Sequence, residues 1–553
     1  MEAALCAMLS KPVATRFLLP GLLLGSALLV RAEVRLHGLF SDHMVLQRGV
    51  SVPVWGWADE GEQVTVQFRK HTAKTVARGG RWMVRLGRLP AGGPDDLRVS
   101  GGNTITLRQV LVGEVWIASG QSNMEWPLRS SLNAETEVAA SAHPMLRLYT
   151  VPKLKADAPR DNIPASWQEC QPSTTSNFSA VAYYFGRDLQ RALKVPVGLI
   201  HTSWGGSPAE AWMSGQVLAS HPDYTREILN TYPDQLKKFE ETLAQFVQDE
   251  EAAKQAGKPF TKRRPATPWK PSQLYNGMIA PLIPFAIQGA IWYQGESNAG
   301  RAWRYRTVFP DMIRNWRRDW GQGDFPFLLV QLAPFRDIKS EPGDSDWAEL
   351  REAQALATHV LRQVGMAVIT DVGEEEDIHP KRKEPVGARL ALAARAIAYG
   401  ERIVSSGPTF KRMTVRGNKA ILTLDHVGRG LEARLVPDKD LAKVQKAGQP
   451  SVVYSTPSGR LTQPLVGFAI AGADRKFVWA HAVIDGGKVV VSSPGVEKPV
   501  AVRYGWADYP VVNLWNKDGL PASPFRTDGF PMITAPKQPA SPGKGGKGGK
   551  VGG

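Results

Sequence analysis

An apolar run that ends in a polar turn decides the fold: Val110-Leu-Val-Gly-Glu-Val-Trp-Ile-Ala118, followed by Ser119-Gly-Gln-Ser-Asn-Met-Glu-Trp126. A run of strand length with almost no polar residue is typical of a strand that is buried on both faces of a parallel sheet. Gly120 permits a tight turn at the end of this strand. Ser122 would then lie exposed where the turn enters a helix, which makes it the first candidate for chemistry.

Similar apolar runs recur along the chain and alternate with amphipathic segments. The runs of strand length are residues 195–200, 287–292, 325–332 and 366–370, and the segments of helical length are 178–193, 305–320, 347–364 and 385–399. Buried strands that alternate with helices predict βαβ units. We therefore expect an α/β domain over residues 111–400, with a parallel sheet and helices on both faces. A polar helical stretch followed by a basic loop predicts an insertion in this domain at about 224–270.

β-rich segments flank this domain on both sides. From residue 34 to 110, short runs with period-2 alternation are separated by Gly and Pro, for example Arg81-Trp-Met-Val-Arg-Leu86, which predicts a small β-sandwich. The alternation returns over residues 401–530, for example in Lys488-Val-Val-Val-Ser492, and predicts a second β-rich domain. Residues 531–553 are rich in Pro, Gly and Lys and cannot bury a core, so we expect a disordered tail.

Residues 1–32 have the pattern of a signal peptide. Lys11 and Arg16 precede the apolar run 17–30, and Val30-Arg-Ala32 places small residues at the −3 and −1 positions of a cleavage site. An uncleaved membrane anchor is the alternative, but the 14 residues of the run are too few to span a bilayer comfortably. We expect an exported protein, secreted or periplasmic, without a membrane segment after cleavage.

The formal net charge of +16 invites a nucleic-acid interpretation. Four lysines in residues 531–553 carry +4 of this charge and the first 32 residues carry +2, which leaves +10 spread over the rest of the chain. No nucleic-acid partner is therefore expected. Hydrophobic residues at 43% and charged residues at 22% also exclude collagen, a coiled coil and wholesale disorder.

The cysteines leave little room for disulfide or metal chemistry. Cys6 lies in the predicted signal peptide, so Cys170 would be alone, and we expect neither an intramolecular disulfide nor a cysteine-based metal site. Residues 167–172 have the composition of a surface loop, which does not favour Cys170 as a nucleophile. The sequence also lacks the H-E-x-x-H, P-loop, Rossmann glycine and G-x-S-x-G patterns. We therefore expect no metal and no cofactor.

In α/β folds, functional side chains collect at the carboxyl ends of the sheet strands. The polar or small residues at these ends are, in chain order, Ser122, Gly205, Gly206, Gln294, Glu296, Asp377 and His379. Together they can supply a serine nucleophile, backbone and amide donors for an oxyanion, and a histidine base oriented by a carboxylate. The set therefore predicts acyl transfer.

Each member of this set has a structural alternative when it is considered alone. A serine after a strand is commonly a helix N-cap, the paired glycines can form a simple helix entry, and the acid-rich loop 371–377 can be solvated. His201 also ends a strand, but a histidine there is more often structural, and we assign it no role. The placement of the whole set at successive strand ends favours the catalytic interpretation.

Four motifs carry a resemblance to a known family: Gly120-Gln-Ser-Asn-Met-Glu-Trp126, Ser203-Trp-Gly-Gly-Ser-Pro-Ala-Glu-Ala-Trp212, Trp292-Tyr-Gln-Gly-Glu-Ser-Asn298 and Asp377-Ile-His-Pro380. The chain resembles the sialate O-acetylesterase family, a branch of the SGNH (GDSL-like) hydrolases that is related to carbohydrate acetyl esterases active on xylan. The likeness extends over about residues 34–527. It implies an SGNH-like sheet in the α/β domain.

The resemblance also implies a role for each residue of the set. Ser122 would be the nucleophile, His379 the general base and Asp377 the group that orients the base. Backbone N–H near Ser122 would help to hold the oxyanion, and the further oxyanion and substrate-binding residues would be Gly205, Gly206, Gln294 and Glu296.

Two positions depart from the pattern of the wider superfamily. Gln294 stands where the superfamily usually has an asparagine. Glu376 stands three residues before His379, where the superfamily usually has the aspartate, and Asp377 stands two before it. We assign the orienting role to Asp377 because Asp-Ile-His-Pro matches the nearer family. Glu376 is the alternative, and a Ser–His dyad without a third member is another.

The implied function is that of an exported serine esterase, which removes O-acetyl groups from carbohydrates, most readily from O-acetylated sialic acids, through an acetyl-enzyme. One alternative is an esterase of acetylxylan or another polysaccharide, and a more distant one is a non-catalytic carbohydrate-binding protein. Arg301 and Arg336 are candidates for a contact with the sialic acid carboxylate. Sugar stacking and core packing explain equally well the four tryptophans beside the motifs, which are Trp126, Trp204, Trp212 and Trp292.

Overall fold

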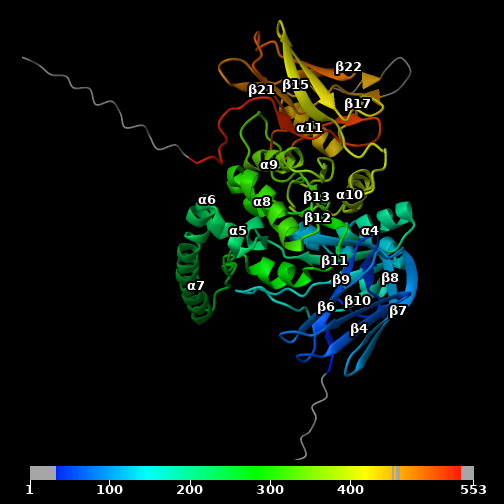
Figure 1. The fold of residues 1–553 in the computed structure, drawn as a ribbon. Helices are drawn as coiled ribbons and strands as arrows, with labels where there is room; N and C mark the ends of the chain where they lie inside the picture. Colours follow the sequence, from blue (N-terminus) through cyan, green and yellow to red (C-terminus); the bar gives the residue numbers. More distant parts are fainter. Residues whose placement is uncertain (1–32, 451–453, 456–460, 537–553) are drawn as a thin grey trace, which may run out of the picture.

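The computed structural model describes residues 33–450, 454–455 and 461–536. The predicted signal peptide lies outside the described residues, and so does the predicted tail from residue 537 onward. Figure 1 shows the N-terminal strands (blue) at one end of the molecule, the helices and sheet of the middle segment (cyan and green) next to them, and the C-terminal strands (orange and red) at the other end.

The middle of the chain is built on a sheet with the strand order β10-β9-β11-β8-β12-β13-β14. Its strands are β8 (Thr104–Gly120), β9 (His143–Thr150), β10 (Trp167–Cys170), β11 (Val197–Ser203), β12 (Gly289–Tyr293), β13 (Phe327–Val330) and β14 (Val364–Ala367). Neighbouring strands from β9 to β14 are parallel, whereas β10 is antiparallel to β9. The expected α/β class is thus confirmed.

Helices cover both faces of this sheet. The four longest that pack on it are α4 (Ala180–Leu193), α8 (Ala302–Trp320), α9 (Asp346–Val360) and α10 (Glu384–Ile397). Trp116 and Ala118 of β8 belong to one apolar cluster with α4 and α10, whereas Val115 and Ile117 belong to another with α8 and α9. Successive side chains of a strand point to opposite faces, so burial on both faces explains why β8 has an almost continuous apolar sequence.

The sheet is mixed rather than purely parallel, which corrects the expectation from the sequence. The first half of β8 pairs in parallel with β2 (Val45–Gln47) and antiparallel with β7 (Gly92–Ser100). The ladder continues from β7 to β4 (Gln63–Phe68) and β5 (His71–Val76). β8 is therefore one continuous strand of 17 residues that crosses the boundary expected at residue 110.

A second sheet of the N-terminal region has the order β1-β3-β6. Its strands are β1 (Arg35–Leu36), β3 (Val52–Trp57) and β6 (Arg81–Leu86). The inner face of this sheet packs through Val54 and Val84 into the apolar cluster that also contains Val110 and Val112 of β8. The N-terminal strands and the α/β sheet therefore share one continuous core.

Short helices connect the strands and one long helix lies outside the sheet. The short ones are α1 (Ser122–Glu125), α2 (Ala134–Ala139), α3 (Pro172–Thr175), α5 (Gly215–Ser220) and α6 (Pro222–Tyr224). The long helix α7 (Tyr232–Gln255) stands apart from the sheet in Figure 1, and Phe246 is its one buried residue. Its polar sequence, within the insertion predicted at about 224–270, reflects this exposure.

Beyond α10 the chain forms two four-stranded sheets and smaller pairs. One sheet contains β15 (Thr409–Arg416), β16 (Lys419–Asp425), β23 (Lys488–Ser492) and β22 (His481–Asp485), and the other contains β21 (Phe477–Trp479), β20 (Phe468–Ala471), β24 (Ala501–Tyr504) and β26 (Phe525–Arg526). The remaining elements are α11 (Asp438–Lys446), the pair β17 (Leu431–Ala433) and β25 (Leu514–Asn516), and the pair β18 (Tyr454–Ser455) and β19 (Leu461–Thr462). The buried guanidinium of Arg351 on α9 donates to the carbonyls of Ala507 and Asp508, which attaches this region to the sheet.

Two further expectations differ from the structure. Residues 167–170 pair with β9 as the edge strand β10 and do not form a surface loop. The Cys170 thiol is buried and donates to the Ser141 carbonyl at 3.3 Å. Burial raises the pKa of this thiol to about 12, so it is no nucleophile at neutral pH. The start of the predicted tail is docked, since the backbone N–H groups of Ile533 and Thr534 donate to the Glu349 carboxylate.

Over the described ranges, no helix has the length and apolar character to cross a membrane.

Candidate active site

Ser122 and His379 are 257 residues apart in the chain and form one hydrogen bond, with 2.8 Å between Ser122 Oγ and His379 Nε2. Ser122 begins α1 directly after β8, and His379 lies on the loop that follows β14. Gly120 makes the turn possible, because its φ is +137° and a Cβ there would lie 2.1 Å from the Tyr293 carbonyl oxygen. A serine in contact with a histidine nitrogen can transfer its proton to that nitrogen.

His379 is oriented by an aspartate and an indole. Asp377 Oδ1 accepts from the His379 backbone N–H at 2.9 Å and lies 3.4 Å from the imidazole Nδ1. The indole of Trp126 stacks on the imidazole with 5.2 Å between ring centroids. Glu376, the alternative partner, is exposed and makes no hydrogen bond with the residues the structure describes. Asp377 is therefore the carboxylate next to His379.

The pKa of His379 is lowered, first by burial and second by the charge of Lys383, while Asp377 acts in the opposite direction. A lowered pKa keeps the imidazole neutral at pH 7. Only the neutral imidazole has a free lone pair for the Ser122 proton. The surroundings of His379 thus favour the state that a general base requires.

Asn123 joins the two sides of the site. Its Nδ2 donates to the Ile378 carbonyl at 3.0 Å and to Glu296 Oε1 at 2.6 Å, and its Oδ1 accepts from Lys383 Nζ. Burial lowers the pKa of Lys383 to about 7 and raises the pKa of Glu296. Glu296, predicted to bind the oxyanion or the substrate, therefore lies in a polar network behind the Ser122–His379 pair.

The loop that contains Gly205 and Gly206 passes close to Ser122, so the backbone N–H groups of these residues are candidates for an oxyanion site. The N–H groups of Ser122 and Gly206 make no hydrogen bond within the described part of the chain, so both are free to bind an oxyanion. The Gly205 N–H instead donates to Glu125 Oε2 at 2.7 Å, and Lys153 pairs with the same carboxylate. A Cβ on Gly205 would lie 3.3 Å from Ser122 Cβ, so this loop passes directly over Ser122.

Gln294 does not have the free amide that the sequence analysis expected. Its side chain is fully buried, and Nε2 donates to the Ser207 carbonyl at 3.2 Å and to Asn298 Oδ1 at 2.7 Å. The Tyr305 hydroxyl donates to Gln294 Oε1 at 2.9 Å. Both amide hydrogens are therefore engaged, and the residue holds the loop after the two glycines instead of presenting a donor to Ser122.

Comparisons with known proteins identify the family of this chain. Residues 264–395 match the family described as carbohydrate esterase, sialic acid-specific acetylesterase, a stretch that contains His379 but not Ser122. The human sialate O-acetylesterase is 30% identical over 455 residues, which cover 74% of this chain and 81% of the relative. The mouse sialate O-acetylesterase is 31% identical over 458 residues, which cover 74% and 83%. The chain belongs to the sialate O-acetylesterase family.

A solved structure extends the likeness of this sialate O-acetylesterase family member to the whole fold. A carbohydrate acetylesterase from Xanthomonas citri superposes with a TM-score of 0.73 at 39% sequence identity, and the match covers 90% of this chain and 100% of that one. The protein is therefore a carboxylic ester hydrolase. In the described residues, no group of three or more His, Cys, Asp and Glu side chains is arranged to hold a metal ion.

A cleft of about 550 Å³ opens beside Gly206 in this esterase. Its charged lining is internally paired, because Arg301 binds Glu210 and Arg304 binds Glu227. The candidate Arg336 lies elsewhere, where it pairs with Asp346 and Asp508. Both predicted arginines are therefore already ion-paired with carboxylates of the protein.

Lys155, to which the sequence analysis assigned no role, lies near the loop that contains Gly205 and Gly206. Lys155 Nζ is 4.3 Å from the ring centroid of Trp269 and 5.5 Å from that of Trp204. It is exposed and has no carboxylate partner among the residues described. The Trp269 Nε1 would lie 4.0 Å from a Cβ on Gly206, so Lys155 and the two indoles border the proposed oxyanion loop.

The remaining sequence candidates are structural. Trp212 and Trp292 are fully buried and pack on each other with 6.1 Å between centroids, so core packing explains both. His201 is buried and bonds to Ser203 Oγ at 2.6 Å, and burial lowers its pKa to about 4.

Asn123, Glu125 and Trp126 lie in the motif around Ser122 and could have been chosen from it. Lys383 could not, because Lys381-Arg-Lys383 has the sequence of a solvated basic run.

Proposed function

We propose that the protein is exported and removes O-acetyl groups from sialic acids by acyl transfer through Ser122. The observation that carries this proposal is the 2.8 Å contact between Ser122 Oγ and His379 Nε2, next to two unoccupied backbone N–H groups. Membership in the sialate O-acetylesterase family supports the acetyl group and the sugar.

In the first step, His379 Nε2 takes the Ser122 proton as Oγ bonds to the carbonyl carbon of the acetyl ester. The negative charge that develops on the carbonyl oxygen is bound by the N–H groups of Ser122 and Gly206. The tetrahedral intermediate then expels the sugar oxygen, which takes the proton from His379. Asp377 stabilises the imidazolium that exists between these two transfers.

In the second step, His379 removes a proton from water as the water oxygen attacks the acetyl-enzyme. The same two N–H groups bind the second oxyanion. Its collapse breaks the bond between Ser122 Oγ and the acetyl carbon, releases acetate and returns the proton from His379 to Oγ. Glu125 and Gln294 hold the glycine loop in place throughout, from its two ends.

The sialic acid carboxylate is bound by Lys155 in this proposal. A free ammonium between two indole rings can pair with a carboxylate while a sugar ring lies against the aromatic surface. The acetyl esters of xylan carry no carboxylate at the acetylated sugar that could use this charge. We therefore place acetylxylan second, and the intact Ser122–His379 pair argues against a non-catalytic binding protein.

The finer points of architecture and location are also proposals. An SGNH-like arrangement of residues 111–400 is supported by Ser122, the glycine pair, Gln294 and His379, which follow β8, β11, β12 and β14 in turn. We propose β domains over residues 34–110 and 401–530 on either side, and no nucleic-acid partner. Export rests on the pattern of residues 1–32, and sequencing the N-terminus of the secreted protein would test it.

A substrate panel tests the proposed reaction. Acetate release is measured from an O-acetylated sialic acid, from acetylxylan and from 4-nitrophenyl acetate, with the wild type and with Ser122→Ala and His379→Ala. We expect the sialic acid ester to be the best carbohydrate substrate and both variants to lose about a thousandfold or more in kcat. Undiminished acetate release by both variants would refute the catalytic assignment. Faster release from acetylxylan than from the sialic acid ester would refute the proposed substrate preference.

A further inference from the structure

The outer face of the β1-β3-β6 sheet carries two tryptophans where an alternating strand normally places polar residues. Trp55 and Trp57 lie on β3, on the face opposite to the side chains of Val52 and Val54, and both are half-buried. Trp55 also packs on Phe40, with 4.7 Å between ring centroids. Across the ladder, Trp55 is paired with Met83 and Trp57 with Arg81 on β6. Large apolar side chains gathered on an outer face are a common sign of a binding surface.

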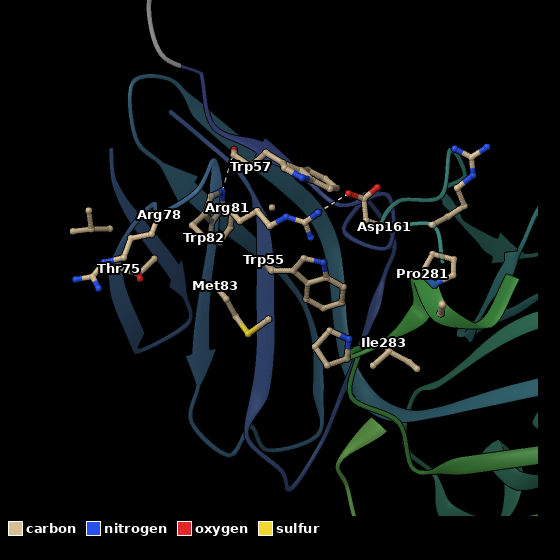
Figure 2. A pocket seen from close by; sticks show the side chains of 15 residues that line it. Trp55, Trp57, Thr75, Arg78, Arg81, Trp82, Met83, Asp161, Pro281 and Ile283 are labelled. Atoms are coloured by element: carbon tan, nitrogen blue, oxygen red, sulfur yellow. Dashed lines mark hydrogen bonds and ion pairs between the residues drawn. The ribbon is translucent and has the colours of Figure 1, made fainter. Parts of the chain in front are cut away.

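This face forms one wall of a cavity of about 660 Å³. The opposite wall is the segment of the α/β region that includes Pro281 and Ile283, together with Asp161. Figure 2 shows Trp55 and Trp57 pointing from β3 toward this wall, with the Arg81–Asp161 ion pair across the opening. Ligand sites are frequent at such junctions between two parts of a protein.

The polar groups of the cavity are available to a ligand. The indole N–H groups of Trp55 and Trp57 bind no acceptor in the described part of the molecule. Arg81 uses one nitrogen, Nη2, to reach Asp161 at 2.8 Å, which leaves its Nε and Nη1 without an acceptor. Both partners of this ion pair are more than half exposed, so it contributes little stability and can rearrange when a ligand enters.

The charge of the cavity is positive. Three arginines, Arg78, Arg81 and Arg160, line it against the single carboxylate of Asp161. Arg78 and Arg160 form no ion pair with any described residue. Planar guanidinium groups bind carboxylates through paired hydrogen bonds, and flat indoles accept the apolar face of a sugar ring.

The cavity and the active site are linked by one segment of chain. Lys153 binds Glu125, which holds the Gly205 N–H, and Asp161 pairs with Arg81. The eight steps of chain from Lys153 to Asp161 can span at most about 29 Å, so these two residues lie within that distance of each other.

We propose that this cavity is a second carbohydrate site, which binds an acidic pyranose of the glycan that bears the acetyl ester. The sugar ring lies on Trp55 and Trp57, and its carboxylate pairs with Arg81. A sialic acid and a uronic acid share this chemistry. The site rests on the proposed function only in that the substrate is a carbohydrate, and it requires no catalysis.

Binding is measured by titration calorimetry on the full secreted chain carrying Ser122→Ala, with three probes that lack acetyl esters: sialyllactose, lactose and a glucuronic acid-bearing xylo-oligosaccharide. Both acidic probes share the required carboxylate, and comparing them identifies which acid is preferred. We expect an acidic probe to bind at least about tenfold more tightly than lactose. Equal binding of lactose and both acidic probes, or no binding of any, would overturn the proposal.

Substitutions then locate the binding. Trp57→Ala and Arg81→Gln should each lower the affinity for the acidic probe by about tenfold or more. Arg85 is an exposed arginine on β6, the strand of Arg81, and does not line the cavity, so Arg85→Gln should leave this affinity unchanged. In the chain that retains Ser122, Trp57→Ala should not change the turnover of 4-nitrophenyl acetate. Unchanged turnover would show that the variant is folded. Unchanged affinity in both Trp57→Ala and Arg81→Gln would refute the location. Failure of the proposed esterase reaction would leave these binding results untouched.

Discussion

The side-chain amide of Asn123 donates a hydrogen bond of 3.0 Å to the backbone carbonyl of Ile378. Asn123 follows Ser122 in the chain and Ile378 precedes His379, so this bond ties the backbone of the proposed nucleophile to the backbone of the proposed base. Glu296 and Lys383 fix the same side chain from behind. Asn123 therefore connects the loop of the proposed nucleophile to the loop of the proposed base.

Removing this tie should slow the reaction more than it weakens binding. We expect Asn123→Ala to lower kcat for 4-nitrophenyl acetate by about tenfold to a hundredfold, because the Ser122–His379 contact is no longer held. KM should change little. The variant should also lose about 1–3 kcal/mol of unfolding free energy, since Glu296 and Lys383 keep their burial but lose their partner. Asn230→Ala, at an exposed asparagine, is the control, and an unchanged kcat in Asn123→Ala would contradict the positioning role.

Lys383 should set the acidic limb of the pH profile. The proposed reaction needs neutral His379, so we expect kcat/KM to fall as the pH drops through the pKa of His379. Lys383 lowers that pKa, and its own pKa of about 7 means that it is charged over the whole acidic limb. Lys383→Met removes the charge and keeps the length, so the pKa of His379 should rise and activity should be lost at a higher pH than in the wild type. A pH profile of kcat/KM measures this, and a shift toward lower pH would be the opposite of the expected result.

The strand ends were predictable from the sequence because burial on both faces leaves an unmistakable apolar run. Ser122, the glycine pair and His379 follow such runs, and the structure brings them together. β9 was not predictable in the same way. His143 and Arg147 interrupt its apolar pattern, and the guanidinium of Arg147 is buried by folding back onto the carbonyl of Pro144.

The parts of the site that were not predictable depend on which partners a side chain finds. Gln294 stands at a strand end like the other candidates, but its amide hydrogens are taken by Ser207 and Asn298, which only the folded loop brings close. Lys383 lies in a basic run, yet it is buried against the ring of Tyr293 with 5.4 Å between Nζ and the ring centroid. Strand position can therefore locate a site, but hydrogen-bond partners decide roles within it.

The turn at Gly120 should tolerate no side chain. A Cβ at this position would lie 2.1 Å from the Tyr293 carbonyl oxygen, and its φ of +137° is unfavourable for any other residue. We expect Gly120→Ala to lower the unfolding free energy by about 2–4 kcal/mol and to displace Ser122, with a loss of kcat. Gly300→Ala is the matched control, because nothing lies within 4 Å of a Cβ there. Chemical denaturation of both variants gives the comparison, and equal stability would show that the turn can relax.

Lys155 should matter only for substrates that carry a carboxylate. We expect Lys155→Gln to raise KM for an O-acetylated sialic acid by about tenfold, because one charge-assisted contact is lost. The methyl ester of the same substrate has no charge, so wild type and variant should hydrolyse it with equal KM. Lys258→Gln, at an exposed lysine of the insertion, is the protein control. An equal rise in KM for the acid and its methyl ester would assign Lys155 a structural role instead.

Glu125 should act through the loop that it holds. Its carboxylate accepts from the Gly205 N–H, and this contact fixes the neighbouring Gly206, whose own N–H is free beside Ser122. Glu125→Ala should let the loop move and lower kcat by about tenfold to a hundredfold, since an oxyanion donor displaced by 1 Å loses most of its effect. Glu125→Gln keeps an oxygen acceptor for Gly205 and should retain most of the activity, although the ion pair with Lys153 is gone. If Glu125 instead blocked a donor that the reaction needs, Glu125→Ala would be faster than the wild type, and steady-state kinetics of the two variants would separate these outcomes.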